Sequence, residues 1–292
     1  MWLVHNRQMQ TQRVPVAAGV DLAVNIWAPD DPPTGATFLL VHGLASNARL
    51  WDGVALRLTA RGHAAIAVDL RGHGQSSKPD GPYDVPTVAD DVAALISALG
   101  LDRPIVAGQS WGGNVVLELA ARHGDLVRGI VCVDGGWLEP GSAFPSWEAC
   151  REALAPPRLA GRPGAELEGY IRRAHPDWPE SGIAGTLANM EWRPDGTIAP
   201  WLTYDRHIAV LRGMWEHRPT ALYPDIRVPV LLAPAISERS REPDKRASVE
   251  RAAHELANAR VHWFTGDHDI HAQHPAELAD VMIDMADSGF FA

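Results

Sequence analysis

The stretch Gly108-Gln109-Ser110-Trp111-Gly112 decides the fold. It follows the apolar run Ile105 to Gly108, which is typical of a short strand, and it opens a helical segment, Gly112 to His123. A sharp turn from strand to helix lifts a serine above the carboxyl edge of a sheet, where a substrate can reach it. The glycines on either side are needed because side chains there would clash in so tight a turn. We therefore predict that Ser110 is a nucleophile.

The alternative is a serine in an ordinary glycine-rich turn. The Gly-x-Ser-x-Gly pattern alone has little specificity, because glycine-rich chains contain it by chance. Here a strand precedes the pattern and a helix follows it, as a nucleophile turn requires. The context therefore favours the catalytic interpretation.

The chain around this motif alternates strand and helix signals, which predicts a mostly parallel sheet flanked by helices. The strands are fully apolar, which indicates a sheet buried on both faces. Further strands are expected at Arg13 to Ala17, Leu22 to Trp27, Thr37 to Val41, Ala64 to Val68, Val127 to Val133, Val228 to Ala233 and Val261 to Thr265. Further helices are expected at Asn47 to Arg61, after Pro86, at Ser248 to Leu256 and at Ala276 to Met285.

The alternation stops near Trp137 and resumes after Pro219. The residues between them are rich in Pro, Gly, Trp and Arg, with weak helical signals such as Ala165 to Arg173. We therefore predict one α/β core formed by residues 1–136 and 220–292, with residues 137–219 inserted as a mainly helical lid after the sixth strand.

An oxyanion formed at Ser110 would need two preorganised backbone donors. The Trp111 N–H is one of them, because it starts a helix whose dipole favours negative charge. The second is expected from the loop after Thr37 to Val41, where the Leu44 N–H fits. His42, in the same loop, is expected to brace it through hydrogen bonds and not to act as the base.

Taken together, four motifs resemble those of the α/β-hydrolase superfamily. They are His42-Gly43, Arg71-Gly72-His73-Gly74-Gln75-Ser76, Gly108-Gln109-Ser110-Trp111-Gly112-Gly113 and Gly266-Asp267-His268. The resemblance covers nearly the whole chain outside the insertion. It implies the α/β-hydrolase fold with high specificity and the substrate hardly at all.

The resemblance also implies that the catalytic base lies on the loop between the last strand and the last helix. His268 occupies that position, and we expect it to activate Ser110. A metal site is the alternative interpretation of five neighbouring residues, although their spacing matches no helix-borne metal motif. These residues are Asp267, His268, Asp269, His271 and His274. We expect no metal and no cofactor.

Two residues compete for the acid that orients the histidine. The commoner family position follows the strand Val228 to Ala233, and Glu238 lies near it, but the usual Gly and Asp are absent there. Asp134 directly follows the strand ending at Val133, a position that the resemblance associates with zearalenone-type lactone hydrolases and some dehalogenases. We favour Asp134 as the acid, with Glu238 as the alternative. The non-catalytic interpretation of Asp134 is an aspartate that stabilises a turn.

Six of the eleven tryptophans lie in or beside the insertion, where they suit a pocket for a bulky apolar group. About half of them are expected simply to pack the lid onto the sheet. The residues expected to contact substrate are His42, Gly43, Trp111 and Trp137.

A serine at the turn favours an acyl-enzyme, and hence a hydrophobic ester or lactone as substrate. Epoxide hydrolases and haloalkane dehalogenases, which this chain also resembles, need an aspartate at this position instead. A carbon–carbon bond hydrolase, a thioesterase, a cofactor-free haloperoxidase and a small-molecule receptor without turnover remain alternatives.

Composition limits the kinds of binding partner and the cellular compartment that we expect for the protein. A net charge of −10 argues against nucleic acid, which needs a basic surface. No apolar run is long enough for a signal peptide or a membrane span, so a cytoplasmic protein is the default expectation. Cys132 and Cys150 are too few for a disulfide framework, and Cys132 is expected to be a buried free thiol. The sequence gives no indication of the oligomeric state.

Overall fold

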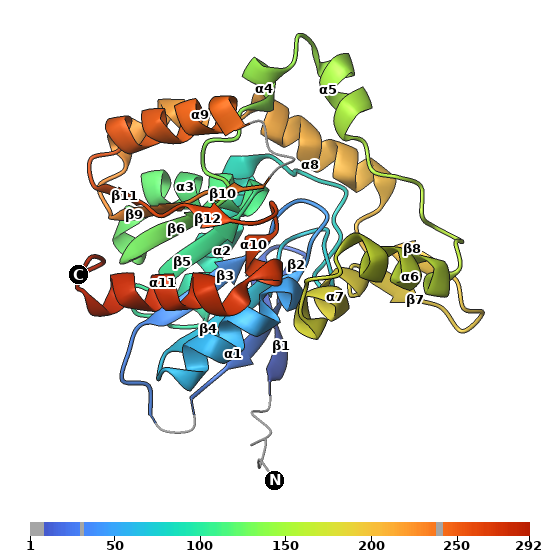
Figure 1. Cartoon of the computed structure of the whole chain (residues 1–292), viewed down its shortest axis with the longest axis horizontal. Helices are drawn as coiled ribbons and strands as arrows, with labels where there is room; N and C mark the ends of the chain where they lie inside the picture. The colour runs from blue at the N-terminus through green and yellow to red at the C-terminus, as the bar shows by residue number, and fades with distance from the viewer. Residues whose placement is uncertain (1–8, 30–31, 238–241) are drawn as a thin grey trace.

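The main sheet of the protein is long, twisted and mostly parallel (Figure 1). The structure is a computed structural model that describes residues 9–29, 32–237 and 242–292. Strands β1 and β2 form an antiparallel hairpin, β2 pairs antiparallel with β4, and all later pairs in the sheet are parallel. In spatial order the strands are β1 (Gln10–Ala17), β2 (Val20–Trp27), β4 (Ala64–Asp69), β3 (Thr37–Val41), β5 (Ile105–Gln109), β6 (Gly129–Val133), β9 (Val230–Ala233) and β11 (Ala259–Val261).

Helices cover both faces of this sheet, and alternate strand residues divide between the two cores. In β3, Leu39 and Val41 face one core, whereas Phe38 and Leu40 face the other. The first core also contains residues of α2 (Val85–Ala98), α3 (Trp111–Arg122) and α9 (Glu242–Glu255), and the second contains residues of α1 (Asp52–Ala60) and α11 (Pro275–Asp287). The fully apolar strands follow from this double coverage, as predicted.

The predicted helix from Asn47 to Arg61 is divided. Asn47 caps a short 3-10 helix, η1 (Ala48–Trp51), by accepting a hydrogen bond from the Arg49 N–H, and α1 continues from Asp52. Three further 3-10 turns are η2 (Gly124–Leu126), η3 (Pro219–Ala221) and η4 (Tyr223–Asp225).

The prediction of one continuous strand from Val261 to Thr265 was wrong, because the structure has two strands there. Its first part, β11, pairs with β9, and its second part, β12 (Phe264–Thr265), pairs with β10 (Ala235–Ile236) in a separate two-stranded ribbon. Pro234 separates β9 from β10 and has no N–H to donate, so the ladder is interrupted there. The ribbon leads directly to α10 (Ile270–Gln273) through the loop that carries His268.

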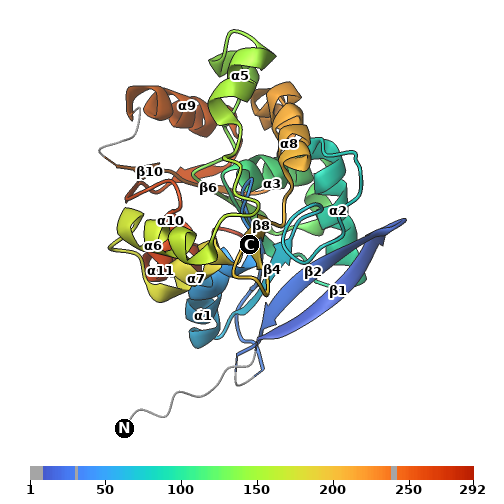
Figure 2. The ribbon, with the colours of Figure 1, turned by 90° about the vertical axis from the view of Figure 1, so that its right-hand side faces the viewer.

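Between β6 and β9 the chain leaves the sheet and forms several short elements. We refer to residues 137–219 as the cap segment. It contains α4 (Pro140–Ala143), α5 (Trp147–Leu154), α6 (Gly164–Ala174), α7 (Glu180–Leu187), the hairpin of β7 (Met190–Trp192) with β8 (Ile198–Pro200), and α8 (Tyr204–Glu216). Figure 1 shows α4, α5 and α8 grouped on one side and α6 and α7 on the other, and Figure 2 shows α5 and α8 apart from α6 and α7 in a second view.

Among the helices of the described residues, none combines the length and apolar character that crossing a bilayer requires.

Candidate active site

Ser110 lies on a strained turn between β5 and α3. Its backbone has φ 54° and ψ −120°, and its N–H donates to the Val133 carbonyl at 2.9 Å. A Cβ atom added to Gly108 would lie 2.1 Å from the Gly112 carbonyl oxygen, so the turn admits no side chain at that glycine. The steric reason predicted for the two glycines is therefore confirmed at Gly108, whereas a Cβ added to Gly112 would lie 2.5 Å from the His42 carbonyl oxygen, outside the turn. The turn leaves Ser110 half-buried at the carboxyl edge of the sheet.

The structure brings His268 and Asp134 together. Nδ1 of His268 lies 2.6 Å from Oδ2 of Asp134, whose side chain is 1% exposed at the end of β6. The Ala235 N–H donates to Oδ1 of Asp134 at 3.0 Å, which fixes the carboxylate. The side-chain amide of Gln109, next to Ser110, donates to the His268 carbonyl at 3.2 Å, so the histidine loop is tied to the nucleophile turn.

This hydrogen bond determines which nitrogen of His268 is free. Asp134 accepts from Nδ1–H, so Nε2 carries the lone pair in the neutral ring. Burial lowers the pKa of His268, but the hydrogen bond to Asp134 and the charges of Asp269 and Asp134 outweigh it and raise the pKa overall. The contact between the two side chains also affects the pKa of Asp134. Burial raises the pKa of Asp134, yet the contacts with His268 and Lys245 outweigh it and hold the pKa below its ordinary value.

Lys245 is a member of this cluster that the sequence analysis missed. Its Nζ donates to both oxygens of Asp134, at 2.8 and 2.7 Å, and to the Ala235 carbonyl at 2.8 Å. It lies near the start of α9 among charged neighbours such as Asp244 and Arg246, and no local signal distinguishes it from them. The competing acid Glu238 lies outside the described residues.

The predicted oxyanion donors lie in the expected loops. No acceptor among the described residues takes a hydrogen bond from the Leu44 or Trp111 N–H. His42 braces the first loop as predicted, because Nε2 accepts from the Leu70 N–H at 3.0 Å and Nδ1 contacts the Gly43 carbonyl at 2.7 Å. Burial lowers the pKa of His42 to about 4, so the ring is neutral and its accepting nitrogen is already used.

Three side chains expected to contact substrate are buried instead. His42 and Trp111 are fully buried and Trp137 is 7% exposed. Trp111 stacks on His73, with ring centroids 5.5 Å apart. The prediction was wrong for the side chains of His42 and Trp111, and Trp137 packs mainly as a core residue. Gly43 does lie close to the nucleophile, since a Cβ added there would be 3.0 Å from the Ser110 Cβ.

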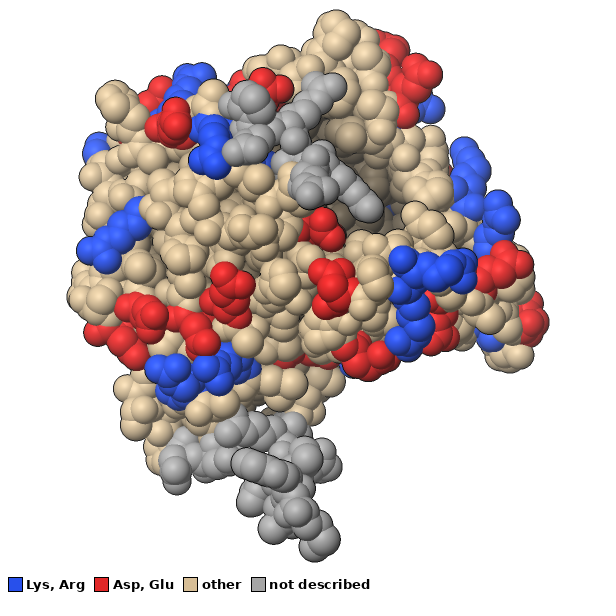
Figure 3. Space-filling model, viewed as in Figure 1, with Lys and Arg blue, Asp and Glu red and all other residues tan. Residues whose placement is uncertain are grey.

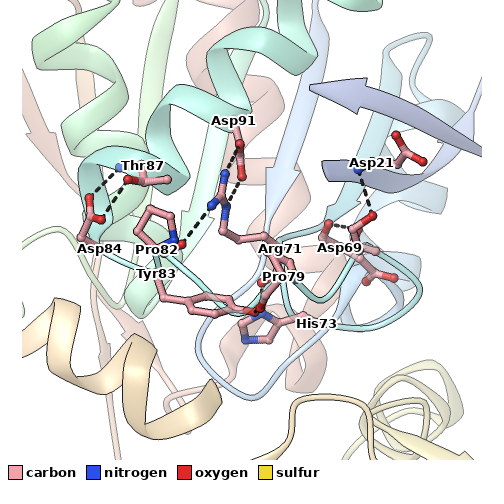
Figure 4. Close-up of polar contacts among 12 residues, drawn as sticks. Asp21, Asp69, Arg71, His73, Pro79, Pro82, Tyr83, Asp84, Thr87 and Asp91 are labelled. Atoms are coloured by element: carbon pink, nitrogen blue, oxygen red, sulfur yellow. Dashed lines mark hydrogen bonds and ion pairs between the residues drawn. The ribbon is translucent and has the colours of Figure 1, made fainter. Parts of the chain in front are cut away.

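The loop after β4 is braced by a buried ion pair (Figure 4). Arg71 donates to both oxygens of Asp91 on α2, at 2.5 and 2.6 Å, and to the Pro82 carbonyl at 2.9 Å. Asp69 accepts from the Ala48 and Gln75 N–H groups at 2.7 and 2.8 Å. The Arg71 motif therefore holds the loop beside the nucleophile, a role that its sequence alone did not reveal.

The histidine and aspartate residues near His268 are not arranged as a metal site. Among the described residues, no group of three or more His, Cys, Asp or Glu side chains is placed to hold a metal ion. His271 is fully buried and packs against Trp51, with ring centroids 4.6 Å apart.

A cavity of about 370 Å³ opens between the cap segment and the core loops. Figure 3 shows a hollow in the surface between the group of α4, α5 and α8 and the group of α6 and α7. The core contributes Ala45, Ser46 and Gly74, and the cap contributes residues before α6, the β7–β8 hairpin and the start of α8. Gly74 is required there, because an added Cβ would lie 2.1 Å from Oδ2 of Asp69.

Comparisons with known proteins place this geometry in a family. Residues 36–163 match the family model described as alpha/beta hydrolase fold. A 2-(acetamidomethylene)succinate hydrolase from Mesorhizobium japonicum is 31% identical over 207 residues, which cover 68% of this chain and 70% of that protein. A solved structure of E-2-(acetamidomethylene)succinate hydrolase has a TM-score of 0.78 at 24% identity, over 96% of this chain and 100% of that one.

Two other relatives match a smaller part. A soluble epoxide hydrolase from a Corynebacterium strain is 38% identical, over 38% of this chain and 40% of its own length. A non-heme chloroperoxidase from Streptomyces lividans is 37% identical, over 37% of this chain and 38% of its own length. The matched part of each is thus less than half of that protein. From the family match and the long alignment to the Mesorhizobium hydrolase, we conclude that the chain belongs to the α/β-hydrolase fold family.

Proposed function

We propose that the protein is a serine hydrolase that cleaves a hydrophobic carboxylic ester or lactone through an acyl-enzyme on Ser110. The observation that carries the proposal is the 2.6 Å hydrogen bond between His268 and the buried Asp134, beside a serine held on a strained nucleophile turn. A buried carboxylate that accepts from Nδ1–H leaves Nε2 as a base, which is the arrangement that activates a serine.

In the first step the Ser110 hydroxyl oxygen attacks the substrate carbonyl while His268 Nε2 takes the hydroxyl proton. Asp134 stabilises the imidazolium that forms, because the two side chains are already hydrogen-bonded. The negative charge on the carbonyl oxygen is stabilised by the Leu44 and Trp111 N–H groups. The ester C–O bond then breaks, and the leaving alkoxide takes the proton from His268.

In the second step a water molecule hydrolyses the acyl-enzyme. His268 removes a proton from the water, the water oxygen attacks the acyl carbon, and the bond to Ser110 breaks. The proton returns to the Ser110 oxygen, so the enzyme is regenerated with no cofactor. In this proposal the cap segment acts as a lid that encloses the small-molecule substrate.

The relatives support hydrolysis but differ in their named substrates. The soluble epoxide hydrolase shares part of the sequence, yet Ser110 stands where the sequence analysis expects an aspartate in that class. The Mesorhizobium relative is named for a substrate with an acetamido group and no ester. We therefore take hydrolysis of a small amide as the second candidate function. A serine activated by the same base can also attack an amide carbonyl.

The first test is whether Ser110 reacts and which bond the protein cleaves. Treatment with a fluorophosphonate, followed by mass spectrometry, should place the adduct on Ser110 and give none in Ser110→Ala. Aryl esters, lactones, thioesters and acetamides of matched size should then be assayed with both proteins. We expect turnover of esters or lactones that Ser110→Ala lacks. Labelling of another serine, or none in a folded sample, would refute the proposed nucleophile, and turnover of acetamides alone would favour the second candidate.

A further inference from the structure

Gln273, the last residue of α10, holds the backbone of the loop that carries His268. Its Oε1 accepts from the Asp267 N–H at 2.6 Å, and its side chain is 9% exposed. On the other side of the histidine, the Gln109 side-chain amide donates to the His268 carbonyl at 3.2 Å. Glutamine side chains therefore hold the loop backbone on both sides of the base.

The glycine of the motif Gly266-Asp267-His268 leaves room for this contact. A Cβ atom added to Gly266 would lie 2.7 Å from Oε1 of Gln273 and 2.6 Å from Cδ1 of Ile270. A side chain at this position would push Gln273 away from the loop. The proposed mechanism gives Gly266 no role, and the structure shows that its lack of a side chain lets Gln273 reach the backbone beside His268.

The other end of the same amide contacts the cap segment. Nε2 of Gln273 donates to Oδ2 of Asp177, in the loop between α6 and α7, at 2.5 Å. A Cβ added to Gly182 on α7 would lie 2.6 Å from the Ala272 carbonyl oxygen, so the cap segment also packs closely on α10. A carboxylate accepts only from donors and a backbone N–H needs an acceptor, so both contacts favour the same orientation of the amide.

We propose that Gln273 is a positioning residue for the base: it keeps His268 within hydrogen-bonding distance of Asp134, and Asp177 of the cap segment keeps its amide in the required orientation. This inference rests on the proposed function for the role of His268. Gln273 acts through the loop backbone. A shift of about 1 Å in a reacting group can reduce the rate about a hundredfold, so the hold on this loop should be visible in turnover.

The first test is Gln273→Met, which keeps the length of the side chain and removes the acceptor for the Asp267 N–H. We expect kcat for an aryl ester to fall at least about tenfold, because the base is displaced. KM should stay within about twofold, because ground-state binding is left intact. Gln12→Met, on the exposed edge strand β1, is the matched control and should keep the wild-type kcat. Circular dichroism and urea denaturation check that each variant is folded under the assay conditions.

The pKa of His268 is the measurement that a merely structural role of Gln273 would not move. Burial lowers this pKa, and the hydrogen bond to Asp134 raises it. The charged groups that act on it are Asp134, Asp269 and Lys245. Gln273→Met changes none of these charges. A displaced loop weakens the hydrogen bond to Asp134, so titration of the His268 ring by proton NMR should give a lower pKa in Gln273→Met than in wild type.

A pair of substitutions tests the contact with the cap segment. Gln273→Glu keeps an acceptor for the Asp267 N–H but brings a second carboxylate against Asp177, so kcat should fall. Adding Asp177→Asn supplies a donor to the new carboxylate, and the double variant should recover most of the wild-type kcat. Asp177→Asn alone should stay close to wild type, because its amide oxygen still accepts from Nε2 of Gln273.

The inference is overturned if either kcat or the pKa of His268 in Gln273→Met stays at the wild-type value, or if the double variant is no more active than Gln273→Glu. The NMR titration needs no turnover, so the two proposals fail separately. A lowered pKa in a protein whose ester hydrolysis does not depend on Ser110 would refute the proposed function and leave the role of Gln273 standing. Turnover that depends on Ser110, with an unchanged pKa in Gln273→Met, would do the reverse.

Discussion

At the residue scale, strain is concentrated where the proposed chemistry lies. Ser110 and Asp134 have φ values of 54° and 43°, a region that side chains with a Cβ disfavour. Such conformations persist where the surroundings over-determine them, and they cluster at functional sites. Asp134 is held by its own N–H to the Ala233 carbonyl at 3.0 Å and by the Ala235 N–H on its carboxylate. Neighbouring strands therefore fix the carboxylate before any substrate arrives.

The first residue-scale prediction concerns Asp134 as the orienting acid. Asp134→Asn keeps the size of the side chain but removes the charge that stabilises the imidazolium and selects its tautomer. We expect kcat to fall by up to ~10⁴ while circular dichroism shows the fold retained. Glu238→Gln is the matched control and should stay within a few-fold of wild type. If Glu238→Gln lost more activity than Asp134→Asn, the orienting acid would be Glu238, near the commoner family position.

A second prediction at this scale concerns Lys245 and the pH profile. The base works only when His268 is neutral, so kcat/KM should rise with pH through the pKa of His268, which lies above the ordinary histidine value. Asp134, Asp269 and Lys245 all act on that pKa, and Lys245 lowers it. Removing the cation in Lys245→Met should therefore raise the pKa of His268 and move the acid limb of the profile to higher pH.

Lys245→Arg retains a positive charge beside Asp134 and is the control for this shift. Its acid limb should stay closer to that of wild type than the limb of Lys245→Met does. Profiles of kcat/KM between pH 5 and pH 9 measure the difference. An acid limb that stays in place in Lys245→Met, or moves to lower pH, would show that Lys245 has only a structural role.

At the scale of elements, the core was predictable because its signals are local. Apolar runs such as Thr37 to Val41 and the glycine-framed turn at Ser110 each specify their own conformation, and the structure has β3 at those same bounds. The division of Val261 to Thr265 into β11 and β12 was not predictable, because it depends on pairing with two different partner strands. Lys245 was missed for the same reason, since its partner Asp134 is 111 residues away.

Attachment of the cap segment to α3 gives an element-scale prediction. Asn114 is fully buried; it accepts from the Gly136 N–H at 3.0 Å, and its amide donates to the Leu138 carbonyl at 2.7 Å. Its amide also lies 3.2 Å from Nδ1 of His217, which follows α8. Asn114→Ala would leave these buried groups unsatisfied, so we expect the free energy of unfolding to fall by about 2 kcal/mol or more.

Chemical denaturation monitored by tryptophan fluorescence measures this loss. The exposed Asn258 offers the matched control, and Asn258→Ala should change the free energy of unfolding by less than about 0.5 kcal/mol. Equal effects of the two substitutions would mean that Asn114 does not connect the cap segment to the core.

At the scale of the whole molecule, the sequence could not predict which tryptophans are buried. Their number near the insertion suggested an aromatic pocket, but burial depends on how the insertion folds back on the sheet. Trp111 and Trp178 are buried, whereas Trp192 is 46% exposed. The cavity itself is formed by loops and cap residues distant in sequence, so neither its volume nor its lining could be predicted.

Buried histidines give the whole molecule a dependence on pH. Burial lowers the pKa of five of them, so the unfolded chain binds protons in mild acid that the folded chain does not, and stability falls as the pH falls below the unfolded value. They are His42, His63, His73, His207 and His271. Four groups with raised pKa values act in the opposite sense, namely Asp52, Asp69, Asp269 and His268. The five buried histidines with lowered pKa values outnumber them, so we expect a net loss of stability in mild acid.

His271 allows one part of this dependence to be isolated. Burial lowers its pKa from 6.5 to about 3, and both ring nitrogens lack a partner within the described residues. His271→Phe therefore breaks no hydrogen bond there and keeps a ring against Trp51. At pH 8 the imidazole is neutral in both states, so a difference there reports packing alone. At pH 5 the unfolded imidazole is charged and the folded one is not, which costs wild type about 2 kcal/mol. The loss of unfolding free energy between pH 8 and pH 5, from urea denaturation, should thus be about 2 kcal/mol smaller in His271→Phe. Equal losses in the two proteins would mean that His271 is protonated in the folded state and is not the neutral core residue described above.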